Sequence, residues 1–127
     1  MLRFVVQGFI VGDAAAVWRA WAPTFPVRPP EEEARNEHLY PLAYGLRIPV
    51  TLVVVNELRN WTVQHGLPAG KVTIDHWIGA AAQGGVHIGQ TYEVVGPMSL
   101  VYRLLAPGIR ASARSSWTDL ARRVAAR

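Results

Sequence analysis

Cysteine is absent from the 127-residue sequence, which excludes disulfide bonds, thiolate nucleophiles and thiolate zinc sites. Long apolar runs are also missing: the longest, residues 48–55, contains Pro49 and Thr51 and is far shorter than the roughly 18 residues of a membrane span. Charged residues are scarce at 17%, whereas hydrophobic residues make up 50%, and this balance argues against a disordered chain. We therefore expect a single cytoplasmic domain over residues 1–127 without stable membrane insertion.

Several site motifs are missing as well. There is no H-E-x-x-H pair, no Gly-Lys-Ser/Thr phosphate loop and no G-x-S-x-G nucleophile elbow. We therefore expect no metal and no other cofactor, and no serine hydrolase chemistry. The apolar residues 4–11 precede three alanines, as in a cleaved signal, but Gln7 and Gly8 interrupt them and Asp13 suits a helix cap, so we expect no cleavage.

The net charge of +4 is unevenly distributed along the chain. From residue 101 onward there are six arginines against one acid, Asp119, whereas the acids gather at residues 31–33. A basic tail suits nucleic acid or anionic lipid, but the aromatic–basic interleaving and recognition-helix patterns of nucleic-acid binders are missing. We interpret the tail as the solvated face of a helix and expect no nucleic-acid partner. The arginines are Arg103, Arg110, Arg114, Arg122, Arg123 and Arg127.

Residue periodicity predicts a strand, a short helix, a run of strands and a final helix. Asp13 suits the N-cap of the first helix, and Pro107–Gly108 is expected to kink or interrupt the last one. The strands are joined by short turns, so they pair antiparallel. The predicted elements are a strand at 3–11, a helix at 14–22, an irregular loop or short helix at 23–36, a short strand or loop at 38–44, strands at 47–56, 57–65, 71–79 and 86–95, with turns at 66–70 and 80–85, and a helix from residue 100 onward.

The fold class that follows is α+β: a curved antiparallel sheet wrapped around a long carboxy-terminal helix, with a short helix after the first strand. Only the last helix has an apolar stripe long enough to cover one face of the sheet. A curved sheet and a helix laid across it leave a gap, which is the natural ligand site. The stripe consists of Leu100, Leu104, Ile109, Ala113, Trp117, Leu120 and Val124.

Three polar side chains are expected on the inner face of this sheet. Alternation places His76 on the same side as Ile74, and Gln90 and Tyr92 on the same side as Ile88. An imidazole suits proton transfer near neutral pH and a phenol suits hydrogen bonding to an enolate oxygen, but an inward histidine is more often a structural residue. Asp75, His87 and Glu93 fall on the outer face unless a β-bulge inverts the alternation, and His65 borders a turn, where we expect it to be solvated.

Four segments carry a family resemblance. They are Phe4–Val11 followed by Asp13–Trp21, Leu67–Trp77, Thr91–Pro97, and Leu100–Leu105 with the basic segment after it. Together they resemble the START/SRPBCC superfamily, which has the helix-grip fold, and most closely its polyketide cyclase/dehydrase branch. Gly12–Asp13 stands where that family usually has Ala-Pro, and residues 23–45 are shorter and richer in proline, which leaves the strand count there open.

The resemblance implies a small enzyme of secondary metabolism that cyclises or dehydrates a polyketide-like substrate without a cofactor. His76 would move a proton, and Tyr92 with Gln90 would hold a carbonyl or enolate oxygen. A non-catalytic carrier of a lipid or other hydrophobic molecule, and a partner-binding domain that uses the basic helix, are the alternatives; monomer and homodimer both stay open. The residues expected to line the substrate site are Gln90, Trp18, Trp61, Ile74, Ile88 and Trp117.

Overall fold

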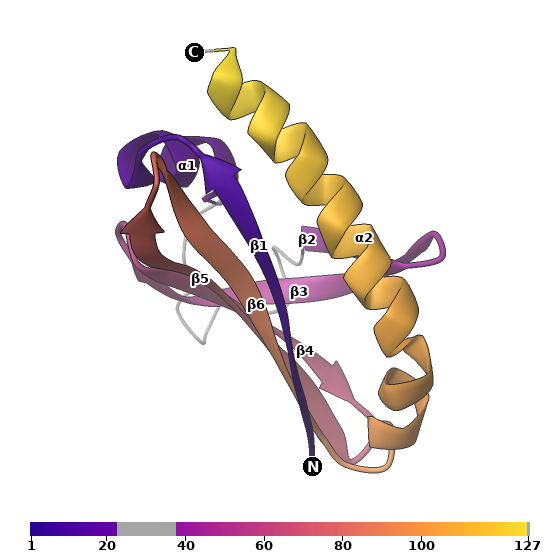
Figure 1. Cartoon of the computed structure of the whole chain (residues 1–127). Coiled ribbons are helices and arrows are strands. Elements are labelled where there is room, and N and C mark those ends of the chain that lie inside the picture. Colours follow the sequence, from indigo (N-terminus) through magenta and orange to yellow (C-terminus); the bar gives the residue numbers. More distant parts are fainter. Residues whose placement is uncertain (23–37, 127) are drawn as a thin grey trace.

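The computed structural model describes residues 1–22 and 38–126, which form an α+β arrangement of one sheet and two helices (Figure 1). The predicted fold class is confirmed: a short helix follows the first strand, and a long helix follows the last. The elements are β1 (Leu2–Val11), α1 (Ala14–Trp21), β2 (His38–Ala43), β3 (Leu46–Asn56), β4 (Asn60–Leu67), β5 (Gly70–Ala82), β6 (Gly85–Val95) and α2 (Ser99–Ala125).

The sheet has the strand order β1-β6-β5-β4-β3-β2, and every neighbouring pair is antiparallel. β1 and β2 are therefore its two edges, and α2 runs across its concave side (Figure 1). The segment 38–43, open in the sequence analysis, is a strand and adds to the sheet beside β3. The predicted loop or helix at 23–36 and the acids at 31–33 lie outside the described residues.

The predicted boundaries need three corrections. β4 begins at Asn60 rather than residue 57, because residues 57–59 form the turn between β3 and β4. β5 and β6 run into the expected loop at 80–85, leaving only a tight turn at Gln83 and Gly84, both of which have positive φ. The expected interruption at Pro107–Gly108 is absent, since α2 is one helix from Ser99 to Ala125. Burial of the helix on both sides of Pro107 outweighs the backbone bond that proline forfeits.

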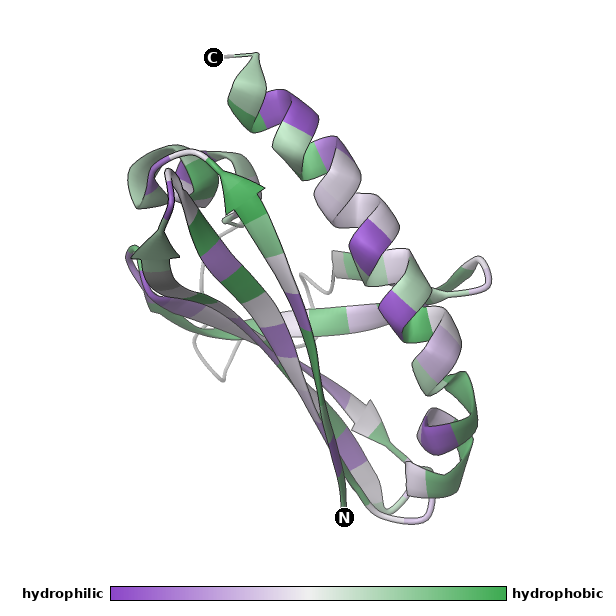
Figure 2. Ribbon diagram, in the orientation of Figure 1, coloured by the Kyte–Doolittle hydropathy of each residue, from purple (hydrophilic) through white to green (hydrophobic). Residues whose placement is uncertain are grey.

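The apolar face of α2 differs from the predicted stripe at its first turns. Ile109 and the later members of the stripe are buried as expected, but Leu100 and Leu104 are 69% and 80% exposed, and Tyr102 takes their place in the core. Leu100 and Leu104 lie two residues either side of Tyr102 and therefore about 200° around the helix from it. Figure 2 shows this exposed apolar segment as the green start of α2.

The inner face of the sheet follows the predicted alternation. His76 and Ile74 on β5, and Gln90, Tyr92 and Ile88 on β6, are all buried. The β5–β6 ladder shifts register only between Ile78 and Ala81, beyond His76, so the shift does not invert its orientation. On the outer face, Asp75 accepts hydrogen bonds from Asn60 and Thr62, Glu93 lies 3.6 Å from Arg3, and His87 is exposed.

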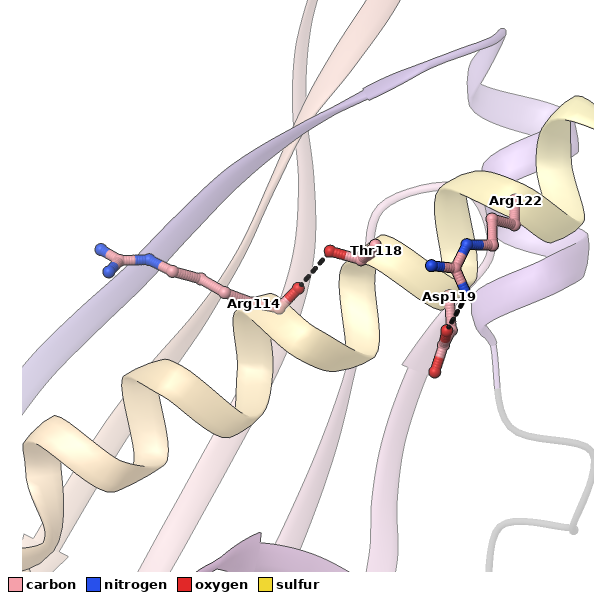
Figure 3. A network of polar contacts seen from close by, with 4 residues as sticks. All are labelled: Arg114, Thr118, Asp119 and Arg122. Carbon is pink, nitrogen blue, oxygen red and sulfur yellow. Dashed lines mark hydrogen bonds and ion pairs between the residues drawn. The ribbon is translucent and has the colours of Figure 1, made fainter.

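The basic residues of α2 behave mostly as a solvated face. Arg122 pairs with Asp119 at 3.1 Å, with both side chains exposed, and Thr118 donates to the Arg114 carbonyl (Figure 3). Arg110 is different: its Nη1 donates to the Val5 carbonyl at 2.7 Å and so fastens α2 to the edge strand β1. Neither described helix is apolar enough over sufficient length to cross a membrane.

Candidate functional site

A cavity of about 380 Å³ lies where the concave side of the sheet faces α2 and the end of α1. Strands β2, β4, β5 and β6 provide one wall, and Ile109 to Arg123 of α2 provide another. The gap expected between sheet and helix is therefore present. Its lining residues are Ala20, Trp21, Ala22, Tyr40, Pro41, Leu42, Trp61, His76, Gln90, Tyr92, Ile109, Ser112, Ala113, Ser116 and Arg123.

The curl of the sheet creates this cavity by bringing its edge strand β2 against β5 and β6. Three strand spacings separate β2 from β5, about 14 Å in a flat sheet, which is more than a tyrosine side chain can span. Nevertheless, the Tyr40 hydroxyl lies 2.8 Å from Nε2 of His76 and 2.7 Å from Nε2 of Gln90. Tyr40 thus joins His76 on β5 and Gln90 on β6 in one hydrogen-bonded chain.

The strand register aligns the other members of this polar cluster. Trp61 on β4, His76 on β5 and Gln90 on β6 are paired in one row across the sheet. Tyr92, two residues further along β6, donates its hydroxyl to Oε1 of Gln90 at 3.1 Å. Four side chains, Tyr92, Gln90, Tyr40 and His76, therefore form one continuous hydrogen-bond network on the cavity wall.

The direction of each hydrogen bond in the network follows from its last acceptor. Nδ1 of His76 lies 3.2 Å from the Trp61 carbonyl, which can only accept, so Nδ1 carries the proton. In a neutral imidazole Nε2 is then the acceptor, and the Tyr40 hydroxyl donates to it. The Tyr40 oxygen in turn accepts from the Gln90 amide, whose carbonyl accepts from Tyr92. Both nitrogens of His76 are occupied in this arrangement.

Burial sets the protonation states of this network. The His76 side chain is 1% exposed, and desolvation lowers its pKa from 6.5 to about 3, against the opposing effect of the Trp61 and Ile74 backbone contacts. Desolvation also raises the pKa of Tyr40 and of Tyr92 well above the usual value for a phenol. At neutral pH the network is uncharged, and none of its members has a pKa near 7.

Aromatic rings form the floor of the cavity. The rings of Trp61 and His76 are stacked, with centroids 3.5 Å apart and planes 3° from parallel. Trp21 meets both of them edge-on, at 5.9 Å from Trp61 and 5.7 Å from His76. Because these contacts fix the Trp61 ring, its Nε1–H is held in place, and it is buried without a hydrogen-bond acceptor among the described residues.

The structure brings together half of the residues that the sequence assigned to the site. His76, Tyr92, Gln90 and Trp61 line the cavity. The other four, Trp18, Ile74, Ile88 and Trp117, are buried in the core and are not among its lining residues. His65 is half-buried rather than solvated, with Nδ1 2.6 Å from the Pro49 carbonyl, so that expectation was wrong.

Sequence reasoning missed two members of the site, Tyr40 and Trp21. The signal for Tyr40 was present, because alternation along residues 38–43 places Tyr40 and Leu42 on one side, but the segment was not assigned to a strand. Trp21 lies in the predicted helix at 14–22 and was not assigned to the site. Among residues 1–22 and 38–126, no three acidic or histidine side chains are grouped in a way that would hold a metal ion.

Comparisons with solved structures support the fold. A protein from Arthrobacter aurescens matches with a TM-score of 0.63 at 11% identity, over 99% of this chain and 87% of its own. Norcoclaurine synthase from Thalictrum flavum, in complex with a transition-state analogue, matches with a TM-score of 0.59 at 10% identity, over 97% of this chain and 94% of its own. The chain has the helix-grip fold. At these identities the likeness extends to the helix-grip architecture alone.

A search with protein-family models gives no match to this helix-grip chain, and a search of curated proteins gives none either. A further structure of the Thalictrum flavum synthase, in complex with dopamine and hydroxybenzaldehyde, matches with a TM-score of 0.57 at 10% identity, over 94% of this chain and 84% of its own.

Proposed function

We propose that the chain binds a small, largely apolar aromatic molecule in the cavity between its sheet and α2. A volume of about 380 Å³ falls in the usual range for a small-molecule site. Trp21 and Trp61 line the cavity and supply aromatic surface that a planar ring can contact. The helix-grip synthase that holds dopamine and hydroxybenzaldehyde demonstrates that this architecture accommodates molecules of that size.

The polar network favours binding over proton transfer. A general base needs an unoccupied lone pair and a pKa near the working pH. Nε2 of His76 accepts from Tyr40, Nδ1 donates to the Trp61 carbonyl, and burial holds the pKa of the imidazole at about 3. This closed network is the observation that carries the proposal: the polar side chains shape the cavity wall and satisfy one another.

The second candidate is cofactor-free cyclisation or dehydration of a polyketide-like substrate. The observation in its favour is that Tyr40, Gln90 and Tyr92 all line the cavity, so a substrate oxygen could replace one link of the network. Under this candidate, His76→Ala abolishes turnover while binding persists. Equal turnover of such a substrate by wild type and variant would remove His76 from the mechanism.

Calorimetric titration with 2-acetylnaphthalene tests the binding proposal. Ser116 lines the cavity, whereas its neighbour Ser115 does not, and both are exposed on α2. Ser116→Trp is therefore expected to weaken saturable binding at least about tenfold by occupying the cavity, and Ser115→Trp to leave it unchanged. Absence of saturable binding to the wild-type protein, or equal weakening by the two substitutions, would overturn the proposal.

A further inference from the structure

Arg123, in the last turn of α2, is the positively charged residue of the described cavity lining. Among the lining residues that α2 contributes, Ser116 and Arg123 are exposed, so the cavity meets solvent on their side. A helix turns about 100° per residue, and Arg123 therefore lies only about 20° around α2 from both Ser112 and Ser116. Helical side chains point back toward the amino-terminal end of their helix, so the long Arg123 side chain extends toward Ser116 along this rim of the cavity.

The positive charge at this rim is not neutralised within the described chain. Of the ion pairs formed within residues 1–22 and 38–126, neither includes Arg123. Asp119 is one helical turn from Arg123, but it pairs with Arg122 at 3.1 Å (Figure 3). No aspartate or glutamate is among the described lining residues. The rim therefore carries one positive charge beside two serine hydroxyl groups, and it offers no counter-charge to a cationic amine.

From this arrangement we infer that the cavity binds an aromatic carboxylate, whose ring lies between the sheet and α2 and whose carboxylate pairs with Arg123 at the rim. The inference rests on the proposed binding function and specifies its ligand class. A planar guanidinium donates two parallel hydrogen bonds to a carboxylate, and Ser112 and Ser116 supply hydroxyl donors on the same face of the helix. One guanidinium balances one negative charge, which favours a carboxylate over a doubly charged phosphate ester. Trp21 and Trp61 supply aromatic surface for the ring.

Two probes of nearly equal shape isolate the contribution of the charge. In 2-naphthoate, which is ionised at pH 7, a carboxylate oxygen replaces the methyl group of 2-acetylnaphthalene. Calorimetric titration in low-salt buffer is expected to show that the wild-type protein binds 2-naphthoate about fivefold more tightly, the increment of a solvent-exposed, charge-assisted pair. Arg123→Gln should abolish this preference and leave the affinity for the ketone unchanged. The preference should also shrink as sodium chloride is added, because salt screens an exposed ion pair.

Arg114→Gln is the matched control, because it removes the same charge from α2 at an exposed residue that is not among the lining residues of this cavity. Arg114 lies about 180° around the helix from Arg123, so the variant should retain the preference. A wild-type affinity for 2-naphthoate no higher than for the ketone, a preference that survives Arg123→Gln, or an equal loss of preference in the two variants overturns the carboxylate inference. Saturable binding of the ketone in any of these cases leaves the binding function intact. Failure of the wild-type protein to bind either probe overturns both.

Discussion

Removing the Tyr40 hydroxyl tests whether the buried network is closed as described. The Tyr40 oxygen accepts from Nε2 of Gln90 at 2.7 Å and its proton goes to Nε2 of His76 at 2.8 Å. Tyr40→Phe therefore leaves two buried groups without partners. Tyr92→Phe leaves only one, Oε1 of Gln90. Each orphaned group costs about 1–3 kcal/mol, so we expect the free energy of unfolding to fall by about 2–6 kcal/mol for Tyr40→Phe and about 1–3 kcal/mol for Tyr92→Phe.

Urea unfolding at pH 7, followed by tryptophan fluorescence, measures both variants on one scale. The pair is well matched, because each substitution deletes one hydroxyl from one tyrosine of the same network. The double variant should cost less than the sum of the two, since both tyrosines contact Gln90. A Tyr40→Phe protein that is no less stable than Tyr92→Phe would refute the two-partner role of Tyr40.

Two further predictions follow from burial and packing. The pKa of His76 is about 3 in the folded protein and 6.5 ordinarily, so between these values the unfolded chain takes up a proton that the folded chain does not. The free energy of unfolding should therefore decrease as the pH is lowered through this range, by up to about 1.4 kcal/mol per pH unit. Urea titrations should show that His76→Gln lacks this contribution. Gly8→Ala should lower the free energy of unfolding by about 1–3 kcal/mol in urea titrations, since its Cβ would lie 2.6 Å from Trp117, whereas Gly66→Ala, with nothing within 4 Å, should not. Unchanged stability of Gly8→Ala would contradict the close contact between β1 and α2.

The sheet and its inner face were predictable because two-residue alternation is a local signal. It placed His76, Gln90 and Tyr92 on one side, and the register confirms that His76 pairs with Gln90 across β5 and β6. The phase of α2 was predictable only after Pro107. Before it, leucines at positions 100 and 104 suggested a stripe by hydrophobicity, but the helix turns Tyr102 inward instead. Hydropathy does not distinguish a buried leucine from an exposed one at a helix end.

The network itself was not predictable, because its central link depends on the curl of the whole sheet. Alternation identifies which residues share a face but not which strands meet across it. Tyr40 contacts His76 because the curl of the sheet brings the edge strand β2 close to β5. The pKa of His76 illustrates the consequence: an imidazole that looks suited to proton transfer at neutral pH is held neutral by burial.

The position of β2 therefore determines which polar groups of the site are free. Without β2, Nε2 of His76 and the Gln90 amide would face the cavity unpaired, and a ligand would meet both an acceptor and a donor there. With β2 in place, the Tyr40 hydroxyl occupies both. A single hydroxyl on an edge strand thus determines whether His76 and Gln90 present free polar groups to the cavity. If this is correct, Tyr40→Phe should raise the preference for 2-acetylnaphthalene over its hydrocarbon analogue 2-isopropenylnaphthalene in competition titrations, because the Gln90 amide becomes free to donate to the ketone oxygen.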